Sequence, residues 1–469
     1  KKEIKCQLLD DKVEVDNLDS LLDKMEGDND QHKFWSKSEK GVIKIIHLSF
    51  KEFLEEHGFY KFNPEGSKSY VFVRVTNNLI DHTSEKEIKD FILNYLLEDD
   101  DTSIYNFFAE HTRYFREEFL TLLSSIDVFF IEDTSNTAYL YYRNCAVKVT
   151  QREVLSIDYI DLGGYVWKDH VIDRSFIMCE RGECDFQEFI HNISGGTDER
   201  VNSMHSTIGY MLHGYKNLSY CPAVILNDEI ISDNPEGGTG KGLFMKGLSE
   251  MKKLVVIDGK SFDFAKSFAY QLVSADTQIL CFDDVKKYFD FEKLFSVVTE
   301  GMTLEKKNKD AIKIPFSKSP KIAITTNYAI RGKGSSFERR KWELELSQHY
   351  TKEFTPLVEF GKHFFGEWND EEWCQFDNFM IRCLQMYLDK GLLRSKFVNL
   401  ELRRLSAESS HEFIEWCGLL ENTTNPLLTL REKTMTNVLY FNFIEEYPDY
   451  GPKAKMSVTR QRFHKWLEA

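Results

Sequence analysis

One glycine-rich segment sets the expected architecture of this chain, and it reads Asn234-Pro235-Glu236-Gly237-Gly238-Thr239-Gly240-Lys241-Gly242. The apolar run Ala223-Val224-Ile225-Leu226 precedes it, and a helix-like segment follows from Leu243 to Met251. A strand, a glycine-rich turn, a lysine and a helix together form a phosphate-binding loop. The glycines let backbone N–H groups turn toward phosphates, and the helix N-terminus adds the positive end of its dipole. We therefore expect residues 237–243 to bind a nucleoside triphosphate.

The loop departs from the usual pattern G-x-x-x-x-G-K-[ST] at two positions. Pro235 replaces the first glycine, and Gly242 stands where a serine or threonine would offer a hydroxyl to Mg²⁺. Thr239 precedes the lysine and is not in the right place to substitute. The sequence Gly-Lys-Gly also occurs in nucleoside monophosphate kinases, so the loop alone does not identify the reaction.

A second apolar run ends in two carboxylates. It reads Gln278-Ile279-Leu280-Cys281-Phe282-Asp283-Asp284, and one predicted strand separates it from Lys241. An aspartate at a strand tip can hold Mg²⁺ through the ion's water shell, and a second can polarise the water that attacks the γ-phosphate. We expect Asp283 in the first role and Asp284 in the second. The alternative is a strand capped by turn-forming acids, because aspartate is common in turns.

Two further polar features follow in the sequence. Asn327 ends the strand-like run Ile322-Ala323-Ile324-Thr325-Thr326. It can orient the attacking water or sense the γ-phosphate, although asparagine after a strand is commonly a turn residue. Arg339 and Arg340 precede a later strand-like run. They form either surface ion pairs or an arginine finger that reaches the nucleotide of a neighbouring subunit.

A basic segment lies between the acidic run and the Asn327 run. Strand-like ends at Thr303 and Ile314 flank the tip Lys306-Lys307-Asn308-Lys309, which predicts a β-hairpin. In a ring this hairpin would point into the central pore and meet DNA phosphates. The alternative is a set of solvated surface lysines. From Glu300 to Glu345 there are eleven Lys/Arg and six Asp/Glu, whereas the whole chain carries a net charge of −16.

The composition limits the class of protein. With 469 residues, 42% hydrophobic and 29% charged, the chain has the size and make-up of a multidomain globular protein. No apolar run approaches the roughly 18 residues of a membrane span, and no signal peptide is present. We expect a cytoplasmic location. Because the chain begins with Lys1 rather than Met, we expect either a fragment or a chain with a further upstream part. Nine scattered cysteines lack zinc-site spacing, so we expect all of them to be reduced.

The pattern of apolar runs predicts an α/β fold in several parts. Buried strands that alternate with helices are typical of a parallel sheet with helices on both faces. We expect an accessory, collar-like α+β domain over residues 1–160, a connector over 161–184 and the core over 185–350. A helical region over 351–430 and a helix-turn-helix or winged-helix-like piece over 431–469 follow. The basic helix in this last piece either binds nucleic acid or packs on the body.

Along the chain, the glycine-rich loop is followed by the acidic pair, the basic hairpin, Asn327 and the arginine pair. This series resembles the superfamily 3 helicases of viruses and phages, which are AAA+-type hexameric ATPases with a P-loop. The loop Gly-Gly-Thr-Gly-Lys-Gly-Leu and the run from Ser336 to Tyr350 are closest to the helicase part of phage and poxvirus-type helicase-primases. The resemblance covers about Asp185 to Tyr350 and is faint before residue 120. In related pore hairpins a histidine follows the central lysine, whereas this chain has Asn308.

The resemblance implies a role for each candidate residue. Lys241 neutralises phosphate charge, Asp283 holds the metal and Asp284 activates water. Asn327 senses the γ-phosphate, and Arg340 or Arg339 acts on the neighbouring subunit. Lys307, helped by Lys306 and Lys309, follows one DNA strand.

The implied function is an ATP-dependent, Mg²⁺-dependent replicative DNA helicase. It forms a homo-oligomeric ring, expected to be a hexamer, on single-stranded or forked DNA. A primase or polymerase partner, or an upstream primase domain, would accompany it in the bacterial host of a phage or prophage, or at a viral replication site. One alternative is an AAA+ switch or loader that binds DNA or protein without unwinding. A small-molecule phosphotransferase of the monophosphate kinase type is another.

Overall fold

The computed structural model describes residues 33–64, 69–98, 101–180, 182–230, 238–266, 268–305, 311–330, 332, 334–419, 423–428 and 434–468. The chain divides into two compact units, the first ending at residue 128 and the second beginning at residue 129. No helix among these residues is long and apolar enough to cross a lipid bilayer.

The first unit combines short antiparallel strands with helices around an aromatic core. Its strands are β1 (Trp35–Lys37), β2 (Ile43–Ile45), β3 (Phe59–Phe62), β4 (Val71–Thr76) and β5 (Leu79–His82), and its helices are α3 (His47–Glu56), α4 (Glu85–Leu96), α5 (Thr102–Glu110) and α6 (Glu117–Leu120). Asn77 and Asn78 both take positive φ between β4 and β5, as a two-residue hairpin turn requires. A capping box between Ser84 and Glu87 starts α4.

The second unit contains two larger sheets and a two-stranded hairpin. Strands β6 (Thr137–Tyr142), β7 (Ala146–Thr150) and β8 (Val154–Ile157) form an antiparallel meander, and β10 (Val171–Ile172) pairs in parallel with β6. The larger sheet is parallel throughout, with the order β12-β13-β16-β11-β17. Its strands are β11 (Ala223–Asp228), β12 (Leu254–Asp258), β13 (Ile279–Val285), β16 (Lys321–Thr326) and β17 (Lys341–Leu346). The predicted mixed α/β class with a parallel sheet is confirmed.

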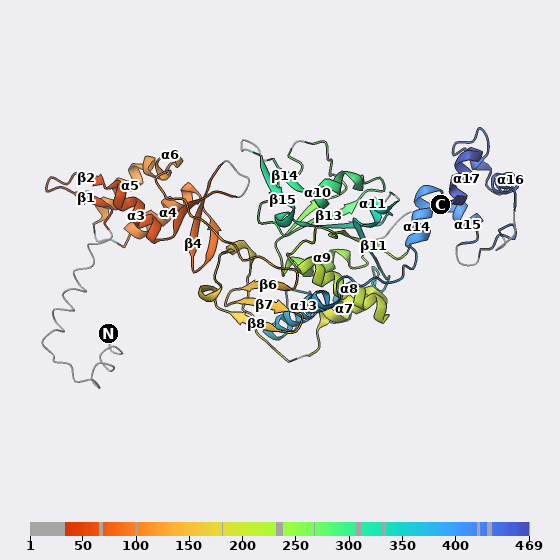
Figure 1. Cartoon of the computed structure of the whole chain (residues 1–469), viewed down its shortest axis with the longest axis horizontal. Coiled ribbons are helices and arrows are strands. Elements are labelled where there is room, and N and C mark those ends of the chain that lie inside the picture. The colour runs from red at the N-terminus through yellow and green to blue at the C-terminus, as the bar shows by residue number, and fades with distance from the viewer. Residues whose placement is uncertain are drawn as a thin grey trace. The chain divides into compact units, whose positions relative to one another are not determined.

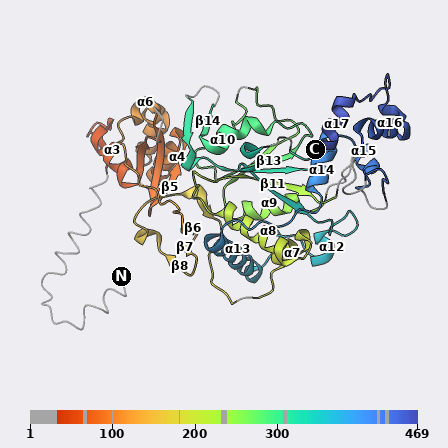
Figure 2. The same cartoon turned by 45° about the vertical axis from the view of Figure 1, so that its right-hand side comes forward.

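Apolar side chains project from both faces of the larger sheet into two hydrophobic cores, so other segments of the chain cover both faces. Val224 and Leu226 pack with α7 (Asp185–Ser194), α8 (Asp198–Leu212), α9 (Lys241–Ser249) and α13 (Asp370–Lys390). Ala223 and Ile225 point the other way, toward the segment that carries α10 (Phe295–Thr299) and the hairpin β14 (Gly301–Leu304) and β15 (Ile312–Pro315). Figures 1 and 2 show α9 and α10 on opposite sides of β13. The alternation follows from the two-residue period of a strand.

A disulfide corrects one expectation from the sequence. The prediction that all nine cysteines are reduced is wrong for Cys179 and Cys374, which are bonded across 195 residues of chain. The segment before α7 lies along α13, where Gln375 Nε2 also donates to the Glu180 carbonyl and Asn378 Nδ2 to the Ile177 carbonyl, at 3.0 and 3.1 Å. Because this proximity arises from packing, spacing rules for local cysteine pairs cannot detect it.

All described secondary-structure elements after β17 are helices, joined by non-helical segments. The short helix α12 (Pro356–Phe360) precedes α13, and α14 (Leu400–Glu408) follows it. Helices α15 (His411–Trp416), α16 (Thr436–Glu446) and α17 (Arg460–Glu468) then share a separate core of aromatic and aliphatic side chains. We call these three helices the C-terminal bundle.

Candidate active site at the carboxyl edge of the sheet

The parallel sheet places the ends of three strands side by side. Strand β16 lies between β11 and β13, so the segments that follow these three strands meet at one edge. Ligand sites of open α/β sheets form at this edge, beyond the carboxyl ends of the strands. Asp228, Asp283 and Asn327 stand at or just past those ends, and α9 begins there at Lys241.

Lys241 is the centre of the polar cluster. Its Nζ lies 2.6 Å from Asp228 Oδ1 and donates to Asn327 Oδ1 at 2.5 Å. Burial lowers the pKa of Lys241, while the nearby Asp228 carboxylate opposes this shift. The Thr239 hydroxyl also donates to Asp228. The structure therefore brings the predicted residues Lys241 and Asn327 into contact, and the Thr239 hydroxyl binds the same Asp228 carboxylate.

The glycines of the loop differ in what their positions require. Gly240 has φ 102°, and a Cβ there would lie 2.9 Å from the Phe189 ring and 3.0 Å from Ile193 Cγ2. Gly238 also has positive φ, at 93°. Gly242 has open space around its missing Cβ. The backbone at Gly240 therefore packs closely against two side chains of α7, whereas residue 242 has room for a side chain. Gly237 lies outside the described residues.

A backbone irregularity orients the acidic pair. The pairing of β13 with β16 shifts register between Phe282 and Val285, and Asp284 takes a left-handed φ of 52°. Bulges of this kind re-aim side chains next to functional sites. Thr325 Oγ1 donates to Asp283 Oδ1 at 2.5 Å and accepts from the Asp284 N–H at 2.7 Å. One hydroxyl on β16 therefore holds both aspartates.

The other predicted residues do not join this cluster. Arg340 lies just before β17, where its carbonyl accepts from Ala223 N–H at the amino end of β11. Its guanidinium stacks over the Phe295 ring at 4.5 Å, and Arg339 is exposed. Both arginines are thus at the opposite edge of the sheet from Lys241. The hairpin arms β14 and β15 pair as predicted, and the tip residues Lys306, Lys307, Asn308 and Lys309 lie outside the described residues.

Sequence reasoning missed three charged residues around the cluster. Asp228 and Lys260 were not singled out from the sequence, and Lys260 Nζ lies 2.5 Å from Asp284 Oδ2. Arg403 comes from α14 and is only 4% exposed. Its Nη2 donates to the Ile230 carbonyl at 3.3 Å, while its Nε and Nη1 have no hydrogen-bond partner among the described residues. Because Arg403 lies far along the chain from Lys241, no local sequence pattern indicates that the two side chains come close.

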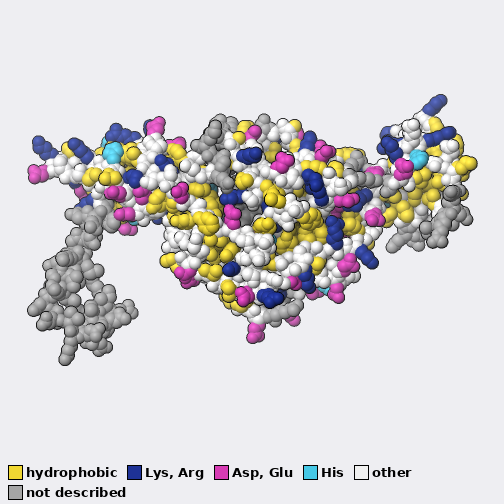
Figure 3. Space-filling model, viewed as in Figure 1, with side chains coloured by type: hydrophobic (Ala, Val, Ile, Leu, Met, Phe, Trp, Pro, Cys, Tyr) yellow, Lys and Arg dark blue, Asp and Glu magenta, His cyan; other side chains and the backbone are white. Residues whose placement is uncertain are grey.

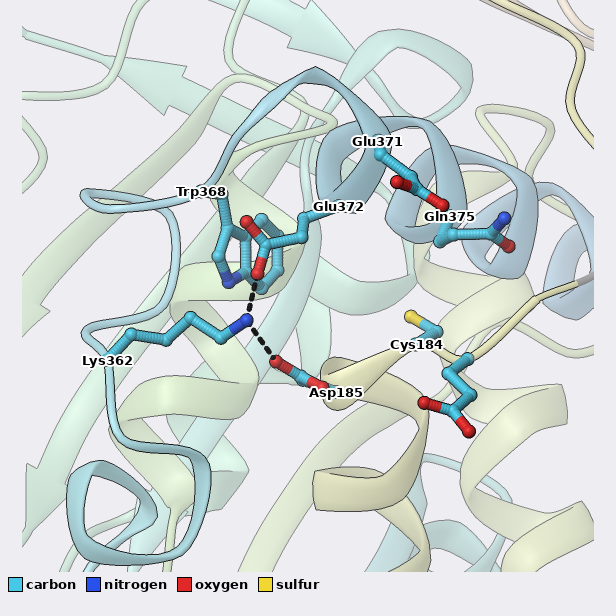
Figure 4. A pocket seen from close by; sticks show the side chains of 8 residues that line it. Cys184, Asp185, Lys362, Trp368, Glu371, Glu372 and Gln375 are labelled. Carbon is cyan, nitrogen blue, oxygen red and sulfur yellow. Dashed lines mark hydrogen bonds and ion pairs between the residues drawn. The ribbon is translucent and has the colours of Figure 1, made fainter.

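A cavity elsewhere has the wrong charge for a phosphate ligand. It has a volume of about 400 Å³ and lies between the start of α7 and the start of α13 (Figure 4). Lys362 pairs there with Asp185, at 3.0 Å, and with Glu372. Glu183 and Glu371 add two more carboxylates to the lining. Because four carboxylates face one lysine, the cavity would repel a triphosphate.

Comparison with known proteins gives a weak likeness. No protein-family model matches the sequence, and no curated protein matches it. The A-form apo structure of the NrS-1 C-terminal region aligns over 89% of this chain and 84% of its own, with 10% identity and a TM-score of 0.43. A second apo structure of that region aligns over 90% and 85%, with 11% identity and a TM-score of 0.42. The candidate site therefore stands on the geometry of this chain.

Proposed function

We propose that the chain is a subunit of an ATP-driven, ring-forming DNA helicase of the superfamily 3 AAA+ type. The observation that carries the proposal is the contact of Lys241 with Asp228 and Asn327, at the edge where Asp283 and Asp284 also end their strand. A lysine at a helix N-terminus, behind a glycine turn and beside a strand-end acid pair, is the arrangement that nucleoside triphosphate hydrolysis requires.

The residues present fit a triphosphate. Gly240 precedes α9, whose first backbone N–H groups lack intrahelical partners and can donate to an anion. Among the described residues, two guanidinium nitrogens of the buried Arg403 have no hydrogen-bond partner, and its charge acts on Glu345, Asp228 and Lys241. Buried N–H groups without an acceptor are unfavourable, and an anion that accepts from them would relieve that penalty. In this proposal Lys241 exchanges Asp228 for the phosphates when nucleotide binds.

The donor set also accounts for the metal. Bound Mg²⁺ would neutralise charge on the phosphates as the terminal bond breaks. Gly242 offers no hydroxyl, and the Thr239 hydroxyl is engaged by Asp228. The metal would therefore rest on Asp283, the phosphates and water. Asp284 would polarise the attacking water, and Asn327 would position it.

The positions of Arg339 and Arg340 favour a role at the nucleotide of a neighbouring subunit. Arg339 and Arg340 lie at the opposite edge of the sheet from Lys241. In a ring they would serve the nucleotide of the neighbouring copy, which makes hydrolysis depend on assembly. The tip of the β14–β15 hairpin, with Lys306, Lys307 and Lys309, would contact the DNA phosphates in the pore. A primase or polymerase partner would act alongside such a ring.

Strand displacement on forked DNA tests this function. The wild-type chain with ATP and Mg²⁺ should release the labelled strand, and omission of ATP should abolish release. ATP hydrolysis without any displacement would refute the helicase proposal and favour an AAA+ switch or loader.

A further inference from the structure

We propose that the C-terminal bundle is a binding module for duplex DNA, with the outer side of α17 and the turn before it as its contact surface. This surface, the basic face, consists of Lys453, Lys455, Arg460, Arg462 and Lys465. The proposal concerns a second nucleic-acid site, separate from the nucleotide cluster and from the β14–β15 hairpin. It can therefore fail or succeed independently of the ATPase.

The bundle fixes which side of α17 faces outward. Phe463 and Trp466 point into the shared core with Phe413, Trp416 and Phe443, and Phe463 is fully buried. Thr459 stands at the helix start, where its hydroxyl accepts from the Arg462 N–H at 3.2 Å. Leu467 is half-buried against the same core, and the other positions on the helix are exposed, namely Arg460, Gln461, Arg462, His464, Lys465 and Glu468. An amphipathic helix anchored by two large aromatic side chains thus presents a polar, mainly basic outer side.

Positive charge gathers on this outer side, in contrast to the rest of the chain. Between Gly451 and Glu468 there are five Lys/Arg and one Asp/Glu, whereas the chain as a whole has a net charge of −16. Lys453 and Lys455 are exposed in the turn that precedes α17. The positive end of the helix dipole adds to their field at the same end. Figure 3 shows Lys and Arg side chains on the surface of the bundle, at the right of the view.

Apart from Glu468, the described acidic residues of the bundle lie outside α17, and two of them, Glu412 and Glu415, stand on α15. Glu445 and Glu446 end α16, and Asp449 lies in the short turn after it. Glu468 lies at the other end of α17, where its carboxylate is 3.4 Å from His464 Nδ1. None of the described ion pairs neutralises Arg460, Arg462 or Lys465. Their charges therefore remain available to an anionic partner.

The form of the basic face favours a duplex over a single strand. A nine-residue helix is about 13 Å long, and the major groove of B-DNA, about 12 Å wide, admits a helix whose first turns reach the bases. Single-strand binding relies on free aromatic faces for base stacking. Here the exposed Phe441 ring is covered on one side by the Arg460 guanidinium, 4.9 Å from its centroid. The deep, narrow major groove of an RNA duplex would not admit the helix.

Binding by the full chain to a labelled 20-base-pair DNA duplex, without nucleotide, tests the proposal. Fluorescence anisotropy would compare wild type with the triple variant Arg460→Ala, Arg462→Ala, Lys465→Ala. The matched control removes three exposed lysines of the first unit through Lys40→Ala, Lys44→Ala and Lys86→Ala. We expect the triple variant to bind at least tenfold more weakly and the slope of log K against log salt to fall by about 3. The control should match wild type.

Several results would overturn the proposal. Equal affinity and slope in wild type and the triple variant would remove the basic face from DNA binding. An equal loss of affinity of the triple variant for single-stranded DNA or duplex RNA would contradict the preference for duplex DNA. A loss of affinity for anionic vesicles alone would indicate that the basic face binds a membrane surface. Circular dichroism and the basal ATPase rate should stay unchanged in the triple variant. Duplex binding that persists in Lys241→Ala would support a site independent of the nucleotide.

Discussion

Two glycines at the start of α9 should respond to the same substitution in opposite directions. Gly240→Ala places a methyl group 2.9 Å from Phe189 and 3.0 Å from Ile193, at a φ of 102°. Phe189 and Ile193 are both fully buried, so neither can move aside freely. The backbone conformation contributes about 1–2 kcal/mol and the overpacking about 1–3 kcal/mol. We therefore expect Gly240→Ala to lower the free energy of unfolding by about 2–5 kcal/mol.

Gly242→Ala is the matched control for this change. Its new methyl group would meet no atom within 4 Å, and alanine favours the helix over glycine by about 0.5–1 kcal/mol. Urea unfolding at 25 °C, followed by far-ultraviolet circular dichroism, would measure both variants against wild type. A lower midpoint for Gly240→Ala and an unchanged or higher midpoint for Gly242→Ala are expected. Equal midpoints for the two variants would refute the assignment of Gly240 as the close-approach position.

Two further predictions concern stability. Cys374→Ser should lower the free energy of unfolding by about 5 kcal/mol on the chain-entropy scale, since the bond closes a loop of 195 residues. A reductant should lower the urea midpoint of wild type and leave that of Cys374→Ser unchanged. A wild-type midpoint that does not respond to the reductant would contradict this prediction. Burial lowers the pKa of His213 to about 4, so its contribution is present above pH 6.5 and is lost as the pH falls toward 4. The urea midpoint should drop less between pH 7.5 and pH 5 in His213→Gln than in wild type, and an identical drop would argue against it.

The parallel sheet was accessible from the sequence because its strands leave a local signal. Apolar runs predicted β11, β13 and β16, and each forms a strand at the expected place. Polar residues after these runs then fall at one edge, since parallel strands share their direction. Lys241 and Asn327, each predicted from the sequence as a site residue, therefore lie in contact.

The features that the sequence did not reveal depend mainly on packing between segments that are distant along the chain. Arg403 on α14 donates to the Ile230 carbonyl, and Cys179 is bonded to Cys374 on α13. No periodicity or spacing rule links residues so far apart. The Asp228 carboxylate was overlooked for another reason. A single acid at the end of a strand is common in turns, and only the observed distance to Lys241 Nζ gives it meaning.

The central claim is that the cluster around Lys241 hydrolyses ATP. The most direct measurement is the rate of phosphate release by Lys241→Ala, with Lys246→Ala as its control on the same helix. Lys246 is exposed and pairs only with Glu250 among the described ion pairs, one turn along α9. We predict that Lys241→Ala loses hydrolysis, while Lys246→Ala keeps the wild-type rate. Phosphate release at the wild-type rate by Lys241→Ala would contradict the claim.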